Sequence, residues 1–446
     1  MNSTDTLRTD LRQRLLPLPL YDIHTHVDCD APSATGLHDI LLYHMVVSDL
    51  YCAGCPDGAR IRDRHDQPEA HERLERAVPF VSHIRNTFCF WGVRIILRDL
   101  YGWTEPIAEH NWRTLDDRIR ERAADRSWHD QVLKQASARR ITTEWARRGT
   151  GALDHCCDYS LEWAFFARTQ EGVNDASLYE LERAWNQPEA SEPMDFTQSG
   201  ERPTLARTVR TVDNVLEAID HYVNCIPFDS IRSTAQHFAT DISYRTVTDQ
   251  MMADALSRRL DATEQDRDIY ASFILVRFLA ALEQRKQRMA FILSMGAEAL
   301  PHETAARFRQ RTVGDFARLV GAHPGLRFIA MNASRHADQS LCTLSRELPN
   351  LTLAGYWWHN FFADSIRRVM STRLDMLPAG NTIGFFSDAY CVEWLYAKAV
   401  MVKTIMANVL TEKVFQGRFT ADEAVSIARQ MLLDTPARLL IGRALG

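Results

Sequence analysis

The chain has no apolar run of about 18 residues, the length that a membrane-spanning helix needs. Its first residues, 1–6, carry neither the basic stretch nor the apolar stretch of a secretory signal. It also lacks an excess of positive charge, since 52 Lys and Arg residues stand against 58 Asp and Glu residues and the net charge is −6. We therefore expect a cytoplasmic protein that binds neither a membrane nor nucleic acid.

Cysteines are too few and too scattered for a disulfide framework. Nine of them, an odd number, are spread over 446 residues, which predicts reduced thiols. The single C-x-x-C, from Cys52 to Cys55, has no second pair at the spacing of a zinc site. It therefore indicates local packing. The chain also has no solenoid repeat and no low-complexity tract.

What the chain has is an ordinary globular composition, with 46% hydrophobic and 25% charged residues. Its length suits one large barrel with insertions, or two to three ordinary domains. Short apolar stretches that predict strands alternate with amphipathic stretches that predict helices. The predicted strands are 20–26, 151–158, 230–237, 289–294, 326–332, 351–357 and 382–388, with a weaker one somewhere in 178–210. About eight strands, each followed by a helix, predict an α/β fold of the (β/α)8 TIM barrel type.

The section 60–149 is rich in helical periodicity and contains no strand candidate that we recognise. It predicts a helical insertion after the first strand. The expected organisation is an N-terminal helix with the first barrel strand and helix in 1–59, the insertion in 60–149, and the remainder of the barrel in 150–446.

His24 and His26 lie one residue apart at the end of the first predicted strand. Alternate residues of a strand point to the same face of the sheet, so both imidazoles can point to one spot. In a TIM barrel the carboxyl ends of the strands form the active site. The pair therefore predicts two ligands of a metal ion at that end of the barrel.

Polar side chains also end most of the later predicted strands. Asp158 and His237 close two middle strands, and Asp388 follows the apolar run 383–387 on the last one. A carboxylate after such a run is costly without a cation or a hydrogen-bond donor beside it. Imidazoles combined with a carboxylate suit zinc, with manganese, iron or nickel as alternatives. We therefore expect one divalent metal ion, held by His24, His26, His237 and Asp388.

The remaining candidates are polar and aromatic residues that end or follow the predicted strands 289–294, 326–332 and 351–357. At the active-site end of a barrel, such residues predict contact with a substrate. They are Ser294, Asn332, Arg335, Trp357, Trp358 and His359. The tryptophans suit an apolar pocket wall.

Two histidines on the first strand and an aspartate on the last, in a β/α barrel, resemble the amidohydrolase superfamily. Three segments resemble its uronate (glucuronate) isomerases: Ser48-Asp49-Leu50-Tyr51, Gly355-Tyr356-Trp357-Trp358-His359-Asn360 and Phe386-Ser387-Asp388-Ala389-Tyr390. The resemblance implies aldose–ketose isomerisation of an open-chain sugar acid through an enediol, with the ion as a Lewis acid. It implies that Asp388 binds the ion or acts as base, and that Tyr51 assists proton transfer. Tyr390 is a further catalytic candidate, since it stands where the family has an arginine.

The sequence departs from this family at positions that handle the substrate. Leu50 replaces a histidine, Tyr390 replaces the arginine, and Ser294 ends a segment in which the family has Gln-Leu-His. An arginine suits a sugar-acid carboxylate because its guanidinium offers two parallel donors. Arg335 is the candidate to supply that group.

These departures keep other functions open. The first alternative is metal-assisted hydrolysis of a lactone, ester or amide, in which the ion activates a water molecule and Asp388 takes its proton. Metal-assisted lyase or decarboxylase chemistry is a lesser alternative, and a barrel that has lost its chemistry and only binds a ligand is another. In each enzymatic case the partner is a small molecule, expected to be a sugar acid or a related carbohydrate. A homo-oligomeric state is left open.

Overall fold

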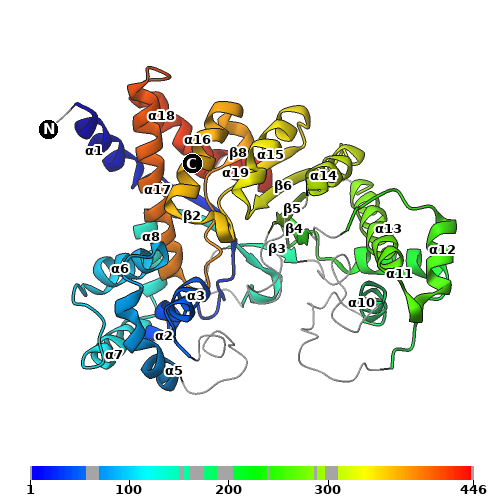
Figure 1. The fold of residues 1–446 in the computed structure, drawn as a ribbon, viewed down its shortest axis with the longest axis horizontal. Coiled ribbons are helices and arrows are strands. Elements are labelled where there is room, and N and C mark those ends of the chain that lie inside the picture. The colour runs from blue at the N-terminus through cyan, green and yellow to red at the C-terminus, as the bar shows by residue number, and fades with distance from the viewer. Residues whose placement is uncertain are drawn as a thin grey trace.

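The computed structural model describes residues 3–56, 70–149, 155–160, 175–187, 204–238, 242–285, 289–296 and 310–442. Eight parallel strands form one sheet in which each strand pairs with its neighbours in sequence. They are β1 (Leu20–Thr25), β2 (Ala138–Glu144), β3 (Cys156–Ser160), β4 (Ser233–Phe238), β5 (Ala290–Met295), β6 (Arg327–Asn332), β7 (Leu351–Ala354) and β8 (Thr382–Ile383). The sheet curls, with helices around it (Figure 1), and the α/β fold is consistent with a TIM-like barrel.

The chain after β8 returns to β1. The backbone N–H of Asp388 donates to the carbonyl oxygen of His24 at 3.0 Å, and the N–H of His26 donates to that of Ala389 at 2.8 Å. These bonds bring the first and last strands of the sheet together at their carboxyl ends. Residues far apart in the sequence therefore meet there, as the sequence predicts for a barrel.

Apolar residues occupy both faces of the strands, because helices cover the outside and side chains fill the inside. In β5, Phe291 and Leu293 belong to the cluster beneath the outer helices. Ala290 and Ile292, which alternate with them, belong to the inner cluster with Ile23 of β1. The period of two along a strand produces this division.

Between β1 and β2 the described chain is helical. Its helices are α2 (Leu37–Leu41), α3 (His44–Cys52), α5 (Ala70–Ala77), α6 (Phe88–Tyr101), α7 (Trp112–Ala123) and α8 (Trp128–Ala136). A second group consists of α10 (Ala176–Trp185) and α11 (Val212–Cys225), which follow β3, and α12 (Asp249–Ser257) and α13 (Glu264–Glu283), which follow β4. Figure 1 shows the two groups on opposite sides of the view, with the sheet between them.

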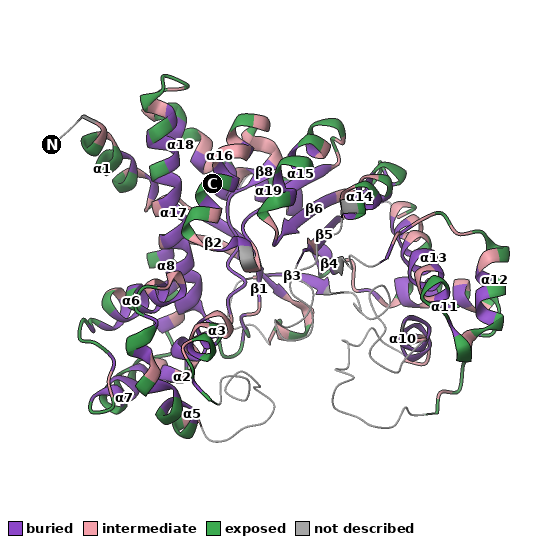
Figure 2. Ribbon diagram, viewed as in Figure 1, coloured by how far each residue is buried: buried purple, intermediate pink, exposed green. Residues whose placement is uncertain are grey.

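The remaining helices lie around the second half of the sheet and at the N-terminus. They are α1 (Ser3–Leu15), α14 (Gln310–Ala322), α15 (Arg335–Glu347), α16 (Ala363–Met376), α17 (Val392–Phe415), α18 (Ala421–Arg429) and α19 (Thr435–Leu440). Helix α17 contacts α1, α6, α8 and α16. Most of its 24 residues are buried (Figure 2), because other helices cover it on several sides.

Buried charges of α17 have partners. One oxygen of Glu393 accepts hydrogen bonds from the Tyr101 hydroxyl at 3.0 Å and the Trp128 indole at 2.9 Å. The other oxygen accepts from the backbone N–H of Ala34 at 2.9 Å. These bonds connect the helices between β1 and β2 to the helix that follows β8.

Strands β7 and β8 end at Ala354 and Ile383, before the predicted ends at 357 and 388. Two further differences from the predicted strands are larger. Strand β2 lies at 138–144, inside the section 60–149 for which no strand was predicted, because Ile141 is its one large aliphatic residue and two arginines precede it. The weak strand prediction in 178–210 is wrong as far as Trp185, because α10 covers Ala176–Trp185. Residues 188–203 of that range lie outside the described residues.

None of the nine cysteines is in a disulfide bond in the structure. Among the described residues, no helix combines the length and hydropathy that crossing a membrane requires.

Candidate functional site

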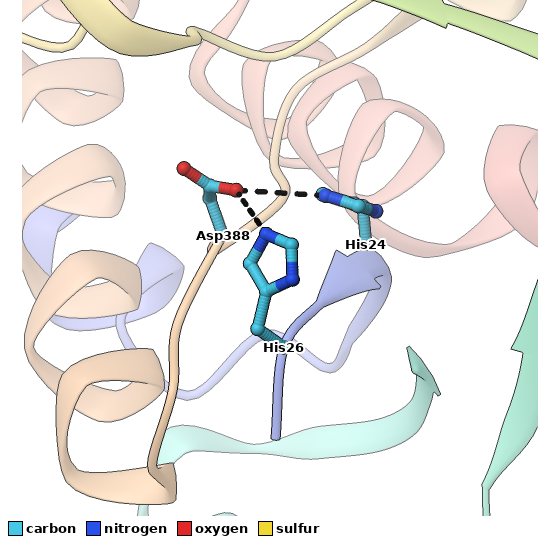
Figure 3. Close-up of side chains that lie close together, drawn as sticks. All are labelled: His24, His26 and Asp388. Atoms are coloured by element: carbon cyan, nitrogen blue, oxygen red, sulfur yellow. Dashed lines mark hydrogen bonds and ion pairs between the residues drawn. The ribbon is translucent and has the colours of Figure 1, made fainter. Parts of the chain in front are cut away.

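His24, His26 and Asp388 converge at the carboxyl ends of the strands (Figure 3). Oδ1 of Asp388 lies 3.1 Å from Nε2 of His26 and 3.5 Å from Nε2 of His24. One ligand atom from each residue lies within 4.8 Å of the others, and in the described parts of the chain this is the one such group of three potential metal ligands. Three of the four predicted metal ligands, His24, His26 and Asp388, therefore meet in space.

The other ring nitrogens face carboxylates of neighbouring strands. Nδ1 of His26 lies 3.0 Å from Oε2 of Glu144, the last residue of β2. Nδ1 of His24 lies 3.4 Å from Oδ2 of Asp158 in β3. A metal-binding imidazole needs such an acceptor for its second N–H, because the acceptor fixes the ring and leaves the other nitrogen to the ion. This arrangement fits a divalent ion on the Nε2 side.

The electrostatics of the cluster favour positive charge at the imidazoles. Burial disfavours the charged form of His24, but hydrogen bonds to Asp158 and Asp388 outweigh it and raise the pKa to about 9. Burial also opposes ionisation of Asp388, yet the two imidazoles hold its pKa well below the usual range. The pKa of Glu144 falls to about 2, because the charge and hydrogen bond of His26 outweigh its desolvation. A divalent cation at the two Nε2 atoms would meet the Asp388 carboxylate there, while Glu144 and Asp158 still accept from the Nδ1 side of each ring.

The backbone of Asp388 is held in a strained conformation. Its φ is +52°, in the left-handed region that non-glycine residues rarely adopt. The Tyr43 hydroxyl donates to the carbonyl oxygen of Asp388 at 2.9 Å. The buried Lys398 ammonium donates to the Tyr43 hydroxyl at 2.7 Å and to the carbonyl oxygen of Ser387 at 2.5 Å. Asp22 of β1 accepts from the N–H of Ser387 at 2.9 Å, so both sides of the turn are fixed.

Aromatic rings border the cluster on one side. The ring of Tyr390 stacks on that of His26, with centroids 4.8 Å apart and planes inclined by 19°. The ring of His44, at the start of α3, makes an edge contact with Tyr390, with centroids 5.8 Å apart, and stacks on Trp358 with centroids 5.5 Å apart. Trp357 lies 6.0 Å from Trp358. Tyr390 and the two predicted tryptophans therefore belong to one aromatic group that reaches the His/Asp cluster.

Three other predicted residues point elsewhere. Tyr51 lies on α3 with 60% of its surface exposed. Arg335, the first residue of α15, forms an ion pair with Asp364 at 3.6 Å. The Asn332 side-chain amide donates to the carbonyl oxygen of Ser334 at 2.6 Å, and its oxygen accepts from the Ser334 N–H at 3.0 Å. Both hydrogen bonds lie within the loop that follows β6.

The last three candidates, His237, Ser294 and His359, lie in or just after strands β4, β5 and β7. His237 lies in β4 beside Ser294 of β5, which is half-buried. His359 lies in a short helical turn after β7, Trp358–Asn360. The side chains of His237 and His359 are outside the described residues.

Sequence reasoning misses several neighbours of the cluster. Glu144 and the nearby Arg147 are missed because strand β2 is not predicted from the sequence. The consecutive β-branched residues 141–143 are the signal from which this strand could have been predicted. Tyr43 is missed because its partners Asp388 and Lys398 are hundreds of positions away in the sequence. Lys398 is missed because the sequence does not show that its side chain turns back to the carbonyl oxygen of Ser387.

The two carboxylates behind the imidazoles yield a direct prediction. We expect Glu144→Gln to weaken metal binding about tenfold, because a neutral amide supports the His26 ring less well than a carboxylate. The measurement is a competition titration of the purified protein with a chromophoric chelator. Glu109→Gln, which changes an exposed glutamate in the loop before α7, is the matched control. Equal affinity of Glu144→Gln and the control would contradict a metal site at His26.

No protein-family profile matches the sequence, and no curated protein sequence matches it. The fold, however, is similar to that of solved structures over nearly the whole chain. The glucuronate isomerase of Caulobacter crescentus superposes with a TM-score of 0.78 at 15% identity, covering 100% of this chain and 96% of that one. The uronate isomerase of Thermotoga maritima superposes with a TM-score of 0.75 at 13% identity, covering 99% of each chain.

A more distant similarity is to a protein from Lactobacillus casei assigned as a metal-dependent hydrolase, with a TM-score of 0.55, 12% identity and 97% of each chain covered. The resemblance to uronate isomerases inferred from short segments is thus confirmed at the level of the fold.

Proposed function

We propose that the protein is a metal-dependent aldose–ketose isomerase that acts on an open-chain sugar acid. The observation that carries this proposal is the convergence of two imidazole Nε2 atoms on one oxygen of Asp388, backed by Glu144 and Asp158. The full-length similarity of fold to uronate isomerases supports the choice of chemistry. An amidohydrolase-type barrel, a cytoplasmic location and homo-oligomers stay predictions.

His24, His26 and Asp388 would hold the ion, and zinc is the expected metal, with manganese, iron or nickel as alternatives. His237, near the end of β4, is the proposed additional ligand. The bound ion would polarise an oxygen of the substrate and so acidify the neighbouring C–H bond.

Proton transfer would be the task of Asp388 and Tyr390. Oδ1 of Asp388 faces the two imidazoles, whereas the other oxygen points away from them (Figure 3) and accepts no hydrogen bond from the described residues. In the proposed reaction this Oδ2 removes the proton beside the carbonyl group and returns it to the adjacent carbon of the enediol. The Tyr390 hydroxyl assists by exchanging the proton of the substrate hydroxyl. Tyr390 takes this role instead of Tyr51 because its ring stacks on His26, while Tyr51 is largely exposed.

The test is an assay of metal-loaded protein against uronates, with detection of the ketose product, and in parallel against a panel of lactones and esters. We expect uronate isomerisation that a chelator abolishes and added zinc or manganese restores. Hydrolysis of the panel without isomerisation would overturn the proposal. Protein that neither retains nor takes up metal would instead favour a barrel with a binding role alone.

Metal-assisted hydrolysis is the second candidate. The fold similarity to an assigned metal-dependent hydrolase favours it, and so does the tyrosine at position 390, where the resemblance leads us to expect an arginine. In that case Asp388 takes a proton from water instead of from carbon. The two panels of substrates separate these reactions directly.

A further inference from the structure

Arg147 is a cation beside the His/Asp cluster that neither the sequence resemblance nor the proposed mechanism uses. It lies three residues after the end of β2, in the turn Trp145–Arg147. Its Nε donates to Oε2 of Glu144 at 2.9 Å, and that same oxygen lies 3.0 Å from Nδ1 of His26. Its guanidinium also sits 5.6 Å from the centre of the Tyr390 ring. Arg147 therefore contacts two residues that border His26.

The outer part of this guanidinium is available. In the described structure its two Nη atoms donate no hydrogen bond, its ion pair with Glu144 has its shortest contact at Nε, and 35% of the side chain is exposed. Lys398 differs, because it is buried and its ammonium already donates to Ser387 and Tyr43. Arg335 differs as well, since it is paired with Asp364.

The charges around the cluster call for a cation if the substrate is an anion. Asp388, Glu144 and Asp158 place three carboxylates around two imidazoles, and even a divalent ion leaves that set without excess positive charge. A carboxylate substrate is repelled by such a site unless another cation meets it. The paired Nη groups of an arginine match a carboxylate with two parallel hydrogen bonds. The contacts with Glu144 and Tyr390 hold the guanidinium in place, which reduces the entropy lost when a ligand binds.

We propose that Arg147 is the specificity residue that binds the carboxylate of the substrate, through its Nη atoms. The ligand class is then a small polyhydroxy carboxylate whose acid end lies near Tyr390 while its other end reaches the His/Asp cluster. This inference rests on the proposed function for the identity of the site, but its test does not require turnover.

The probe is gluconate, an open-chain sugar acid that lacks the carbonyl group and cannot isomerise, and its neutral counterpart is glucitol. Calorimetric titrations of the metal-loaded protein compare the wild type with Arg147→Met, Arg147→Lys and Arg148→Met. We expect Arg147→Met to weaken gluconate binding by about 10- to 100-fold, the range for a lost charge-assisted contact, and Arg147→Lys to weaken it less. Arg148→Met is the matched control, because Arg148 stacks on Trp145 and donates to its carbonyl oxygen.

A purely structural role of Arg147, through Glu144, would lower the metal content or weaken gluconate and glucitol alike. Metal content is therefore measured for each variant, and the ratio of the two affinities is the decisive quantity. The proposal is overturned if Arg147→Met binds gluconate within twofold of the control, if both ligands weaken equally, or if the wild type does not bind gluconate. An absence of isomerase activity with Arg147-dependent gluconate binding would instead reject the proposed reaction and retain the carboxylate site.

Discussion

Asp388→Asn is expected to lower turnover by about 10³-fold or more, because several kcal/mol of stabilisation by the ion and its ligands are lost and each 1.36 kcal/mol is tenfold in rate. The substitution removes the charge that faces both imidazoles at 3.1 and 3.5 Å, and it replaces the proposed base with an amide. We expect the metal content of the variant to fall as well. The measurements are the rate of ketose formation and the bound metal per chain.

The same variant is expected to stay folded. Asparagine tolerates the left-handed conformation about as well as aspartate does, so φ of +52° at this position adds no new strain. The bonds from the N–H of residue 388 to His24 and from Tyr43 to its carbonyl oxygen involve the main chain and survive the substitution. Far-ultraviolet circular dichroism of Asp388→Asn should match that of Asp28→Asn, an exposed control just after β1. Near-wild-type activity in a folded Asp388→Asn protein would contradict the assignment of Asp388 as metal ligand and base.

The sequence predicts the centre of this site because the relevant information is local. Two histidines separated by one residue point to the same face of a strand. In a barrel, the first and last strands are neighbours, so an aspartate after the last strand lies close to these histidines. The structure brings them together from the two ends of the sheet. Tyr390 is a candidate only through the family resemblance, and the structure places its ring on that of His26.

Arg335 illustrates a failure of the same rule. It follows β6 closely enough to be counted as a strand-end residue, but it begins α15 and pairs with Asp364 of α16. The sequence gives the position of a residue along the chain and leaves the direction of its side chain undetermined. In the folded chain the Arg335 guanidinium pairs with the Asp364 carboxylate in the first turn of α16.

Glu144 and Arg147 show the opposite failure. Strand β2 carries Arg139 and Arg140 at its start, and only Ile141, Thr142 and Thr143 are buried, so its apolar signal is weak. The strand forms because pairing with β1 and β3 satisfies its backbone. Tertiary context thus decides an element that local propensity leaves ambiguous.

The second large effect is expected at Lys398. Replacing it with methionine leaves the carbonyl oxygen of Ser387 and an acceptor position of the Tyr43 hydroxyl without their buried donor. Such a loss costs about 2–4 kcal/mol of unfolding free energy. It also removes the group that holds the turn before Asp388, and a displacement of about 1 Å in a catalytic group costs about 10²-fold in rate. We therefore expect Lys398→Met to lower both the stability and kcat.

Lys413→Met is the control that separates this effect from the general consequence of changing a buried lysine in α17. Lys413 is on the same helix and is also buried, but its partner Asp375 is half-exposed and is bound by Arg418 as well. Its loss leaves no buried acceptor unpaired, so we expect a change of at most about 1 kcal/mol and unaltered kcat. Urea unfolding and steady-state kinetics of both variants test the difference. If Lys398→Met were destabilised but kept full kcat, Lys398 would support the fold without positioning Asp388, and the strained turn would have to be held by Tyr43 and Asp22 alone.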